Sequence, residues 1–118
     1  MALLVKPGVT FKRFTPALIH MLNVLLQIAQ EGRDLVPGMP EDLVVTSAND
    51  ATHATTSRHY KDEALDIRSK SFPHRAAKDL LRMNLQARLG PKFTVLFENE
   101  GGAQEHFHCQ VKRGGTYP

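Results

Sequence analysis

Histidine and aspartate side chains occur in this 118-residue sequence at a spacing that suits a metal site. His59 precedes Asp66 by seven positions, and His106 and His108 are separated by a single residue. Zinc prefers neutral imidazole and carboxylate ligands in a tetrahedral arrangement, and a catalytic zinc keeps one position open for water. Two histidines and one aspartate supply three such ligands, so the sequence predicts a site that holds Zn²⁺.

The pair His106 and His108 lies in a segment whose alternating polarity predicts a strand. Side chains two positions apart on a strand share a face, about 7 Å apart at a rise of about 3.3–3.4 Å per residue. We therefore expect both histidines to face a cleft, while Phe107 and Cys109 point into the core. Cys109 is the only cysteine, which excludes an internal disulfide and a zinc site built from several thiolates.

A hydrolytic zinc site also needs a carboxylate that takes a proton from water and passes it to the leaving amine. Glu105 stands three residues before His108, at the start of the same predicted strand. It is therefore the expected general base.

Two helices are predicted to support these segments. Thr15 and Pro16 match the N-cap and first position of a helix that ends at Gly32. Apolar residues recur along it at three- and four-residue spacing, at Leu18, Met21, Leu22, Leu25 and Ile28. Pro73 is predicted to begin the second helix, and Gly90-Pro91 to end it.

Four strands are predicted at residues 43–46, 64–67, 93–97 and 106–111, with a loop over 47–57 and a turn at Gly101-Gly102. This order predicts an α+β fold, with a small, mostly antiparallel sheet and helices packed on one face. A chain of 118 residues suits one domain, here residues 1–118.

The composition argues against several partners. Fifteen Lys and Arg against twelve Asp and Glu give a formal charge of +3, and the basic residues are scattered, so we expect no nucleic-acid partner. The apolar run before Lys6 is too short for a signal peptide, and no stretch suits membrane insertion. We expect a monomer that is cytoplasmic until another route releases it.

Two motifs resemble those of a known superfamily. Ser57-x-His59-x-x-Asp62-x-Ala64-x-Asp66 resembles the S-x-H-x-x-G-x-A-x-D motif of the D-Ala-D-Ala metallopeptidases. Residues 105–108 resemble their E-x-x-H motif, and the likeness covers about residues 43–112. The superfamily also includes phage L-alanyl-D-glutamate endopeptidases and the zinc fold of hedgehog signalling domains, so the resemblance implies a hedgehog-like fold.

The resemblance implies roles for individual residues. His59, Asp66 and His108 take the positions of the zinc ligands, and Glu105 that of the general base. Residues 106–112 also look like the hedgehog strand H-I-H-C-x-V-K.

His53, six positions before His59, stands where hedgehog domains carry a histidine near the metal. In such a site His53 or His106 could stabilise the oxyanion of the tetrahedral intermediate. Aligning the strand at 93–97 with hedgehog makes Glu98 a rival to Glu105 as the base. The short Glu-x-x-His spacing favours Glu105, because it needs no insertion.

The sequence departs from the motif at two places. Asp62 replaces the glycine, at a position that often needs unusual backbone freedom. The superfamily's substrate-binding arginine has no clear counterpart in residues 47–50, so Arg58 and Arg68, with the motif residue Ser57, are the candidates for substrate binding.

The sequence therefore predicts a zinc metallopeptidase that hydrolyses peptidoglycan stem peptides at the cell wall or in the periplasm. It could act as a D-Ala-D-Ala carboxypeptidase or an L-Ala-D-Glu endopeptidase, and its small size suits a phage endolysin domain. The alternatives are a non-catalytic zinc-binding interaction module of the same fold and a basic adaptor without metal. The carboxylate of Glu105 favours the enzyme, because a pure binding module has no use for a base.

Overall fold

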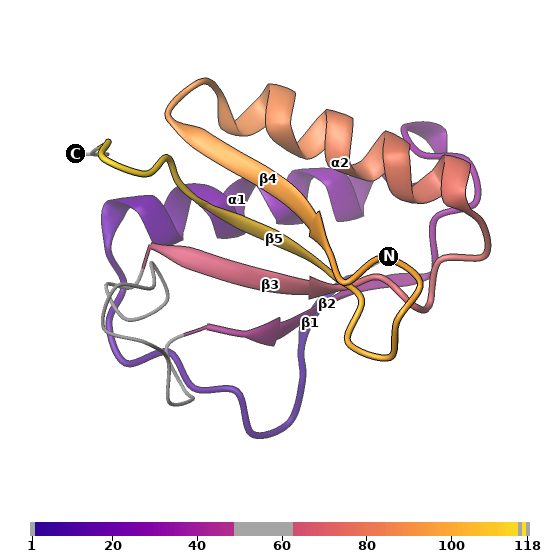
Figure 1. The fold of residues 1–118 in the computed structure, drawn as a ribbon, viewed down its shortest axis with the longest axis horizontal. Helices are drawn as coiled ribbons and strands as arrows, with labels where there is room; N and C mark the ends of the chain where they lie inside the picture. Colours follow the sequence, from indigo (N-terminus) through magenta and orange to yellow (C-terminus); the bar gives the residue numbers. More distant parts are fainter. Residues whose placement is uncertain (1, 49–62, 116, 118) are drawn as a thin grey trace.

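The structure is a computed structural model that describes residues 2–48, 63–115 and 117. The elements in chain order are β1 (Ala2–Val5), α1 (Pro16–Glu31), the short 3₁₀ helix η1 (Gly32–Asp34), β2 (Asp42–Ser47), β3 (Ala64–Arg68), α2 (Arg75–Leu89), β4 (Phe93–Glu98) and β5 (His106–Val111). They form a small α+β fold in which two helices pack on a five-stranded sheet, as Figure 1 shows.

The sheet is mixed, with strand order β1-β2-β3-β5-β4. β1 pairs with β2 in parallel, and the other neighbouring strands are antiparallel. α1 packs against β1, β2 and β3, while α2 packs against β4 and against α1, so both helices cover one face (Figure 1). The predicted α+β class and mostly antiparallel sheet are thus confirmed, whereas the parallel edge strand β1 was not predicted.

Both helices use local caps. The Thr15 hydroxyl accepts a hydrogen bond from the Leu18 amide at 3.2 Å, and Gly32 ends α1 with a φ of 57°. These ends match the prediction. α2 begins two residues later than predicted, because His74 is its N-cap and accepts a hydrogen bond from the Ala77 amide at 3.3 Å.

The core lies between the helices and the sheet. Most sheet side chains that point toward the helices are buried: Leu43, Val45, Leu65, Ile67, Phe93, Val95, Phe107, Cys109 and Val111. Leu3 and Phe97 on the same face are partly buried. Phe107 and Cys109 are therefore core residues, as predicted, and the Cys109 Sγ atom lies 3.5 Å from the Met21 Sδ atom of α1. Neither helix in the described ranges is long and apolar enough to cross a membrane.

Candidate metal centre

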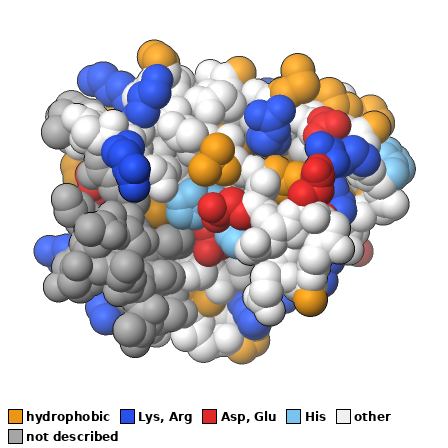
Figure 2. Space-filling model, viewed as in Figure 1, with side chains coloured by type: hydrophobic (Ala, Val, Ile, Leu, Met, Phe, Trp, Pro, Cys, Tyr) orange, Lys and Arg blue, Asp and Glu red, His pale blue; other side chains and the backbone are white. Residues whose placement is uncertain are grey.

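Four side chains that could bind a metal converge on the open face of the sheet. Asp66 comes from β3, Glu98 from the end of β4, and His106 and His108 from β5. Asp66 is the register partner of His108, and Glu98 that of His106, so each pair points to the same side of the sheet. Each residue offers one ligand atom, and these atoms all lie within 4.8 Å of one another. Figure 2 shows histidine and acidic side chains together at the middle of this face.

The distances inside this four-residue group are close to those between ligand atoms of one metal ion. The His108 Nδ1 atom lies 2.7 Å from the Asp66 Oδ1 atom and 3.8 Å from the Glu98 Oε1 atom. The His106 Nε2 atom lies 3.0 Å from the same Glu98 oxygen and 3.6 Å from the same Asp66 oxygen. Ligand atoms that share a tetrahedral zinc at about 2.0–2.1 Å lie about 3.3 Å apart. Small side-chain shifts would therefore bring the group to coordination distance.

The backbone fixes how His106 presents its ring. The His106 Nδ1 atom lies 2.7 Å from the Gln104 carbonyl oxygen, which can only accept, so Nδ1 carries a hydrogen. The Nε2 atom then faces carboxylate oxygens of Asp66 and Glu98. Its lone pair would be repelled by theirs unless a proton or a metal ion lay between them. Metal-binding histidines commonly donate their second ring N–H to a carbonyl in this way.

His108 is held at both ring nitrogens. Its Nε2 atom lies 2.7 Å from the Gln110 Oε1 atom, opposite the contact with Asp66. Burial opposes protonation of the ring, but the hydrogen bonds to Asp66 and Gln110 and the nearby carboxylate charges outweigh it, so the pKa of His108 is raised. The group therefore attracts positive charge to the point where a metal would bind.

The structure brings together two of the three predicted zinc ligands, Asp66 and His108. The third, His59, lies outside the described residues, as do His53, Ser57, Arg58 and Asp62. His106, predicted as an oxyanion-stabilising residue, is itself a member of the four-residue group.

Glu105, the predicted base, is not brought into this group. Its Oε1 atom accepts hydrogen bonds from the Ser69 hydroxyl at 2.6 Å and the Lys78 ammonium at 2.7 Å, and its Oε2 atom accepts one from the Gly101 amide at 2.9 Å. Burial opposes ionisation, but these bonds outweigh it and lower the pKa of Glu105 to about 2. The reason is geometric: a residue three positions before His108 on an extended chain points to the opposite side.

Glu98, the rival base, is the acidic residue that joins the group. Its side chain is 43% exposed, so solvent and a substrate can reach it. The hairpin of β4 and β5 explains its place in the group, because Glu98 and His106 are the last pair of facing residues before the connecting turn.

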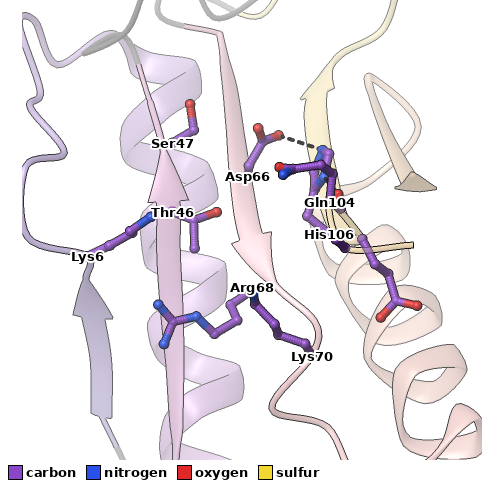
Figure 3. A pocket seen from close by; sticks show the side chains of 10 residues that line it. Lys6, Thr46, Ser47, Asp66, Arg68, Lys70, Gln104 and His106 are labelled. Carbon is purple, nitrogen blue, oxygen red and sulfur yellow. Dashed lines mark hydrogen bonds and ion pairs between the residues drawn. The ribbon is translucent and has the colours of Figure 1, made fainter. Parts of the chain in front are cut away.

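A pocket of about 280 Å³ borders the group (Figure 3). Asp66 and His106 form part of its wall, and Lys6, Arg68 and Lys70 contribute positive charge. Arg68 was predicted to bind substrate and lines this pocket. The two lysines were not predicted as site residues.

Comparison with known proteins adds no further assignment. No model of a known protein family matches the chain, and no curated protein matches it. The geometry itself shows that Asp66, Glu98, His106 and His108 form a group that could hold a metal ion.

Proposed function

We propose that this chain is a zinc-dependent peptidase that hydrolyses peptide bonds in peptidoglycan stem peptides. The observation that supports it is the convergence of two imidazoles and two carboxylates beside an open pocket. The choice of peptidoglycan peptides as the substrate rests on the two sequence motifs that resemble those of D-Ala-D-Ala metallopeptidases.

The donor set favours zinc over Mg²⁺ and Ca²⁺. Mg²⁺ and Ca²⁺ prefer sites made entirely of oxygen, whereas imidazole with carboxylate suits Zn²⁺. In this proposal His59, Asp66 and His108 hold the ion, as the motif resemblance implies. Gln110 would orient His108 by accepting a hydrogen bond from its second ring nitrogen, as the hydrogen-bond partners of zinc-binding histidines do.

A bound Zn²⁺ would supply Lewis acidity, which polarises a scissile carbonyl and lowers the pKa of a water molecule. Glu98 would accept the proton from the attacking water and deliver it to the leaving amine. Its Oε1 atom lies 3.0 Å from the His106 Nε2 atom, so His106 would orient the carboxylate. His106 could also stabilise negative charge on the carbonyl oxygen.

Mass spectrometry of purified peptidoglycan fragments tests this proposal. The fragments are incubated with zinc-loaded protein and, in parallel, with protein treated with a chelator. We expect zinc-dependent loss of a terminal D-Ala or release of stem peptides, which identifies the bond. Intact fragments from Gram-negative and Gram-positive walls, with zinc bound to the protein, would favour the non-catalytic zinc-binding module instead.

A further inference from the structure

The outer edge of β4 carries backbone groups that a further strand could use. β4 ends the strand order of the sheet, beside β5. The Lys112 amide donates to the Lys92 carbonyl at 2.8 Å, so the even-numbered residues of the strand are the ones whose backbones bond to β5. The amides and carbonyls of Phe93, Val95 and Phe97 therefore point away from β5.

The sequence of this edge strand favours pairing with another strand. Residues 93–97 read Phe-Thr-Val-Leu-Phe, with no charge, proline or glycine among them. Aromatic and β-branched residues favour strands, and an exposed edge of this composition tends to pair with another chain. Edge strands are usually protected by charge, by short length or by a covering element. β4 has six residues and no charge before Glu98, so cover has to come from elsewhere in the fold.

Gln86 covers part of this edge from α2, which packs against β4 (Figure 1). Its Nε2 atom donates to the Phe93 carbonyl at 2.8 Å, and its Oε1 atom accepts from the Val95 amide at 2.9 Å. These partners fix which end of the side-chain amide is which, because a carbonyl only accepts and a backbone amide only donates. The side chain thus offers β4 a donor and an acceptor together, as the backbone of an added strand would.

The next groups along the same edge are open. The Val95 carbonyl and the Phe97 amide have no hydrogen-bond partner within residues 2–48, 63–115 and 117. Arg75 and Lys78 lie over the Phe97 ring, at 5.5 and 5.7 Å from its centroid, and leave these backbone groups free. In the described part of the chain, Gln86 is therefore the side chain that bonds to the outward backbone of β4.

The strand that fits this edge is β4 of a second copy. In an antiparallel pair centred on Val95, the Val95 amide and carbonyl of each copy bond to those of the other. The Phe93 carbonyl of each copy then accepts from the Phe97 amide of the other. A two-fold axis relates the two strands, so the same residues serve in both copies. This pairing needs the Phe93 carbonyl and the Val95 amide, which are the two groups that Gln86 occupies.

We propose that Gln86 keeps the chain monomeric by closing the edge of β4 against β4 of a second copy. The inference is independent of the proposed peptidase function, because it involves neither the metal group nor the pocket. With Gln86 in place, pairing first has to break two hydrogen bonds in each copy. Without Gln86 that cost disappears, so we expect self-association to become stronger by about tenfold or more.

Sedimentation velocity of the full chain over a wide range of concentration tests this inference. We expect the wild type to stay monomeric at concentrations where Gln86→Ala forms a dimer, with a dissociation constant lower by about tenfold or more. Asn84→Ala is the matched control and should behave like the wild type. Its amide lies on the same helix but donates to the Leu80 carbonyl at 2.9 Å. Thermal unfolding checks that each variant is folded.

A second substitution shows whether the dimer uses β4. Leu96 is 44% exposed on this strand, so a lysine there can remain in solvent. In the antiparallel pair the two lysines would lie diagonally across the contact and repel each other. Leu96→Lys added to Gln86→Ala should therefore restore the monomer.

Hydrogen exchange reads the Gln86 contact without any substitution. In the wild type the Val95 amide should exchange about tenfold or more slowly than the Phe97 amide, because it is bonded to Gln86. In Gln86→Ala both amides should exchange rapidly at low concentration and slowly in the dimer.

Equal exchange of these two amides in the wild type would overturn the inference, even if Gln86→Ala does not fold. A folded Gln86→Ala variant that stays monomeric at every concentration would also overturn it, as would a wild type that associates equally strongly. Association that survives Leu96→Lys would place the contact elsewhere, for example at the other edge strand β1, and would reject β4.

Discussion

Glu98 and Glu105 differ in what their carboxylates contact. Glu98 faces His106 and is 43% exposed, whereas Glu105 accepts hydrogen bonds from Lys78, Ser69 and the Gly101 amide. A carboxylate with a pKa of about 2 holds a proton too weakly to shuttle it efficiently near neutral pH. We therefore assign the general base to Glu98 in the proposed mechanism.

Glu98→Gln should lower kcat by about 10²–10⁴-fold, the usual contribution of a general base, while zinc remains bound. Activity is followed by chromatography of peptidoglycan fragments, and zinc by elemental analysis. Glu100→Gln is the matched control, because Glu100 lies two residues away in an exposed pair with Arg75. If Glu98→Gln keeps full activity and folded Glu105→Gln loses it, the base is Glu105.

Spacing along the sequence was enough to predict those site residues that lie on the same strand. His106 and His108 were found because alternation along one strand places them on one face. Glu98 was only the second candidate for the general base, because its approach to His106 depends on how β4 and β5 pair across the intervening turn. Lys6 was missed for the same reason: its place in the pocket depends on a strand pairing between distant segments.

At the scale of elements, Glu105 connects the start of β5 to α2. Its carboxylate contacts Lys78 on α2 and Ser69 after β3, with a side chain only 9% exposed. The residue predicted as catalytic thus holds together the elements that support the site.

Glu105→Gln should lower the free energy of unfolding by about 2 kcal/mol at pH 7, since a hydrogen bond to a charged group contributes about 1.5–3 kcal/mol. The folded pKa of Glu105, about 2, lies below the ordinary 4.5. The ionised carboxylate therefore stabilises the fold above pH 4.5, and this contribution is lost as the pH falls toward 2.

Urea unfolding of wild type and Glu105→Gln at pH 7, 4.5 and 2.5 tests this sign. The difference in unfolding free energy should shrink across the two lower values. Glu100→Gln, in an exposed pair, should show little difference at any pH. A Glu105→Gln difference that stays constant with pH would show that the charge contributes nothing.

The helix ends were predictable because caps are local. Thr15-Pro16, Gly32 and Gly90 mark boundaries that the structure shows. β1 was not predicted, because four residues give little local signal and its parallel partner β2 lies some forty positions away.

At the scale of the whole molecule, the helices lie on one side of the sheet (Figure 1). The core lies on that side, and the candidate site lies on the other. This division confirms the α+β class and the helices on one face. A specific likeness to the hedgehog or D-Ala-D-Ala peptidase fold remains a prediction.

Cys109 reports on the integrity of this core. Burial, with a smaller contribution from the Asp66 charge, raises the pKa of its thiol to about 12, and the residue is fully buried. A thiol-reactive dye at pH 8 should therefore leave the native protein unlabelled and label one thiol per chain in guanidinium chloride. Rapid labelling of one equivalent in the native protein would contradict the packing of β5 against α1.

The central claim is the metal centre, and zinc stoichiometry after dialysis tests it most directly. We expect about one zinc per wild-type chain, and loss of that zinc in Asp66→Ala and His108→Ala. His74→Asn is the control, because it removes a histidine from outside the group and still supplies an N-cap for α2. Zinc at background level in the wild type, or retained in both alanine variants, would contradict the account.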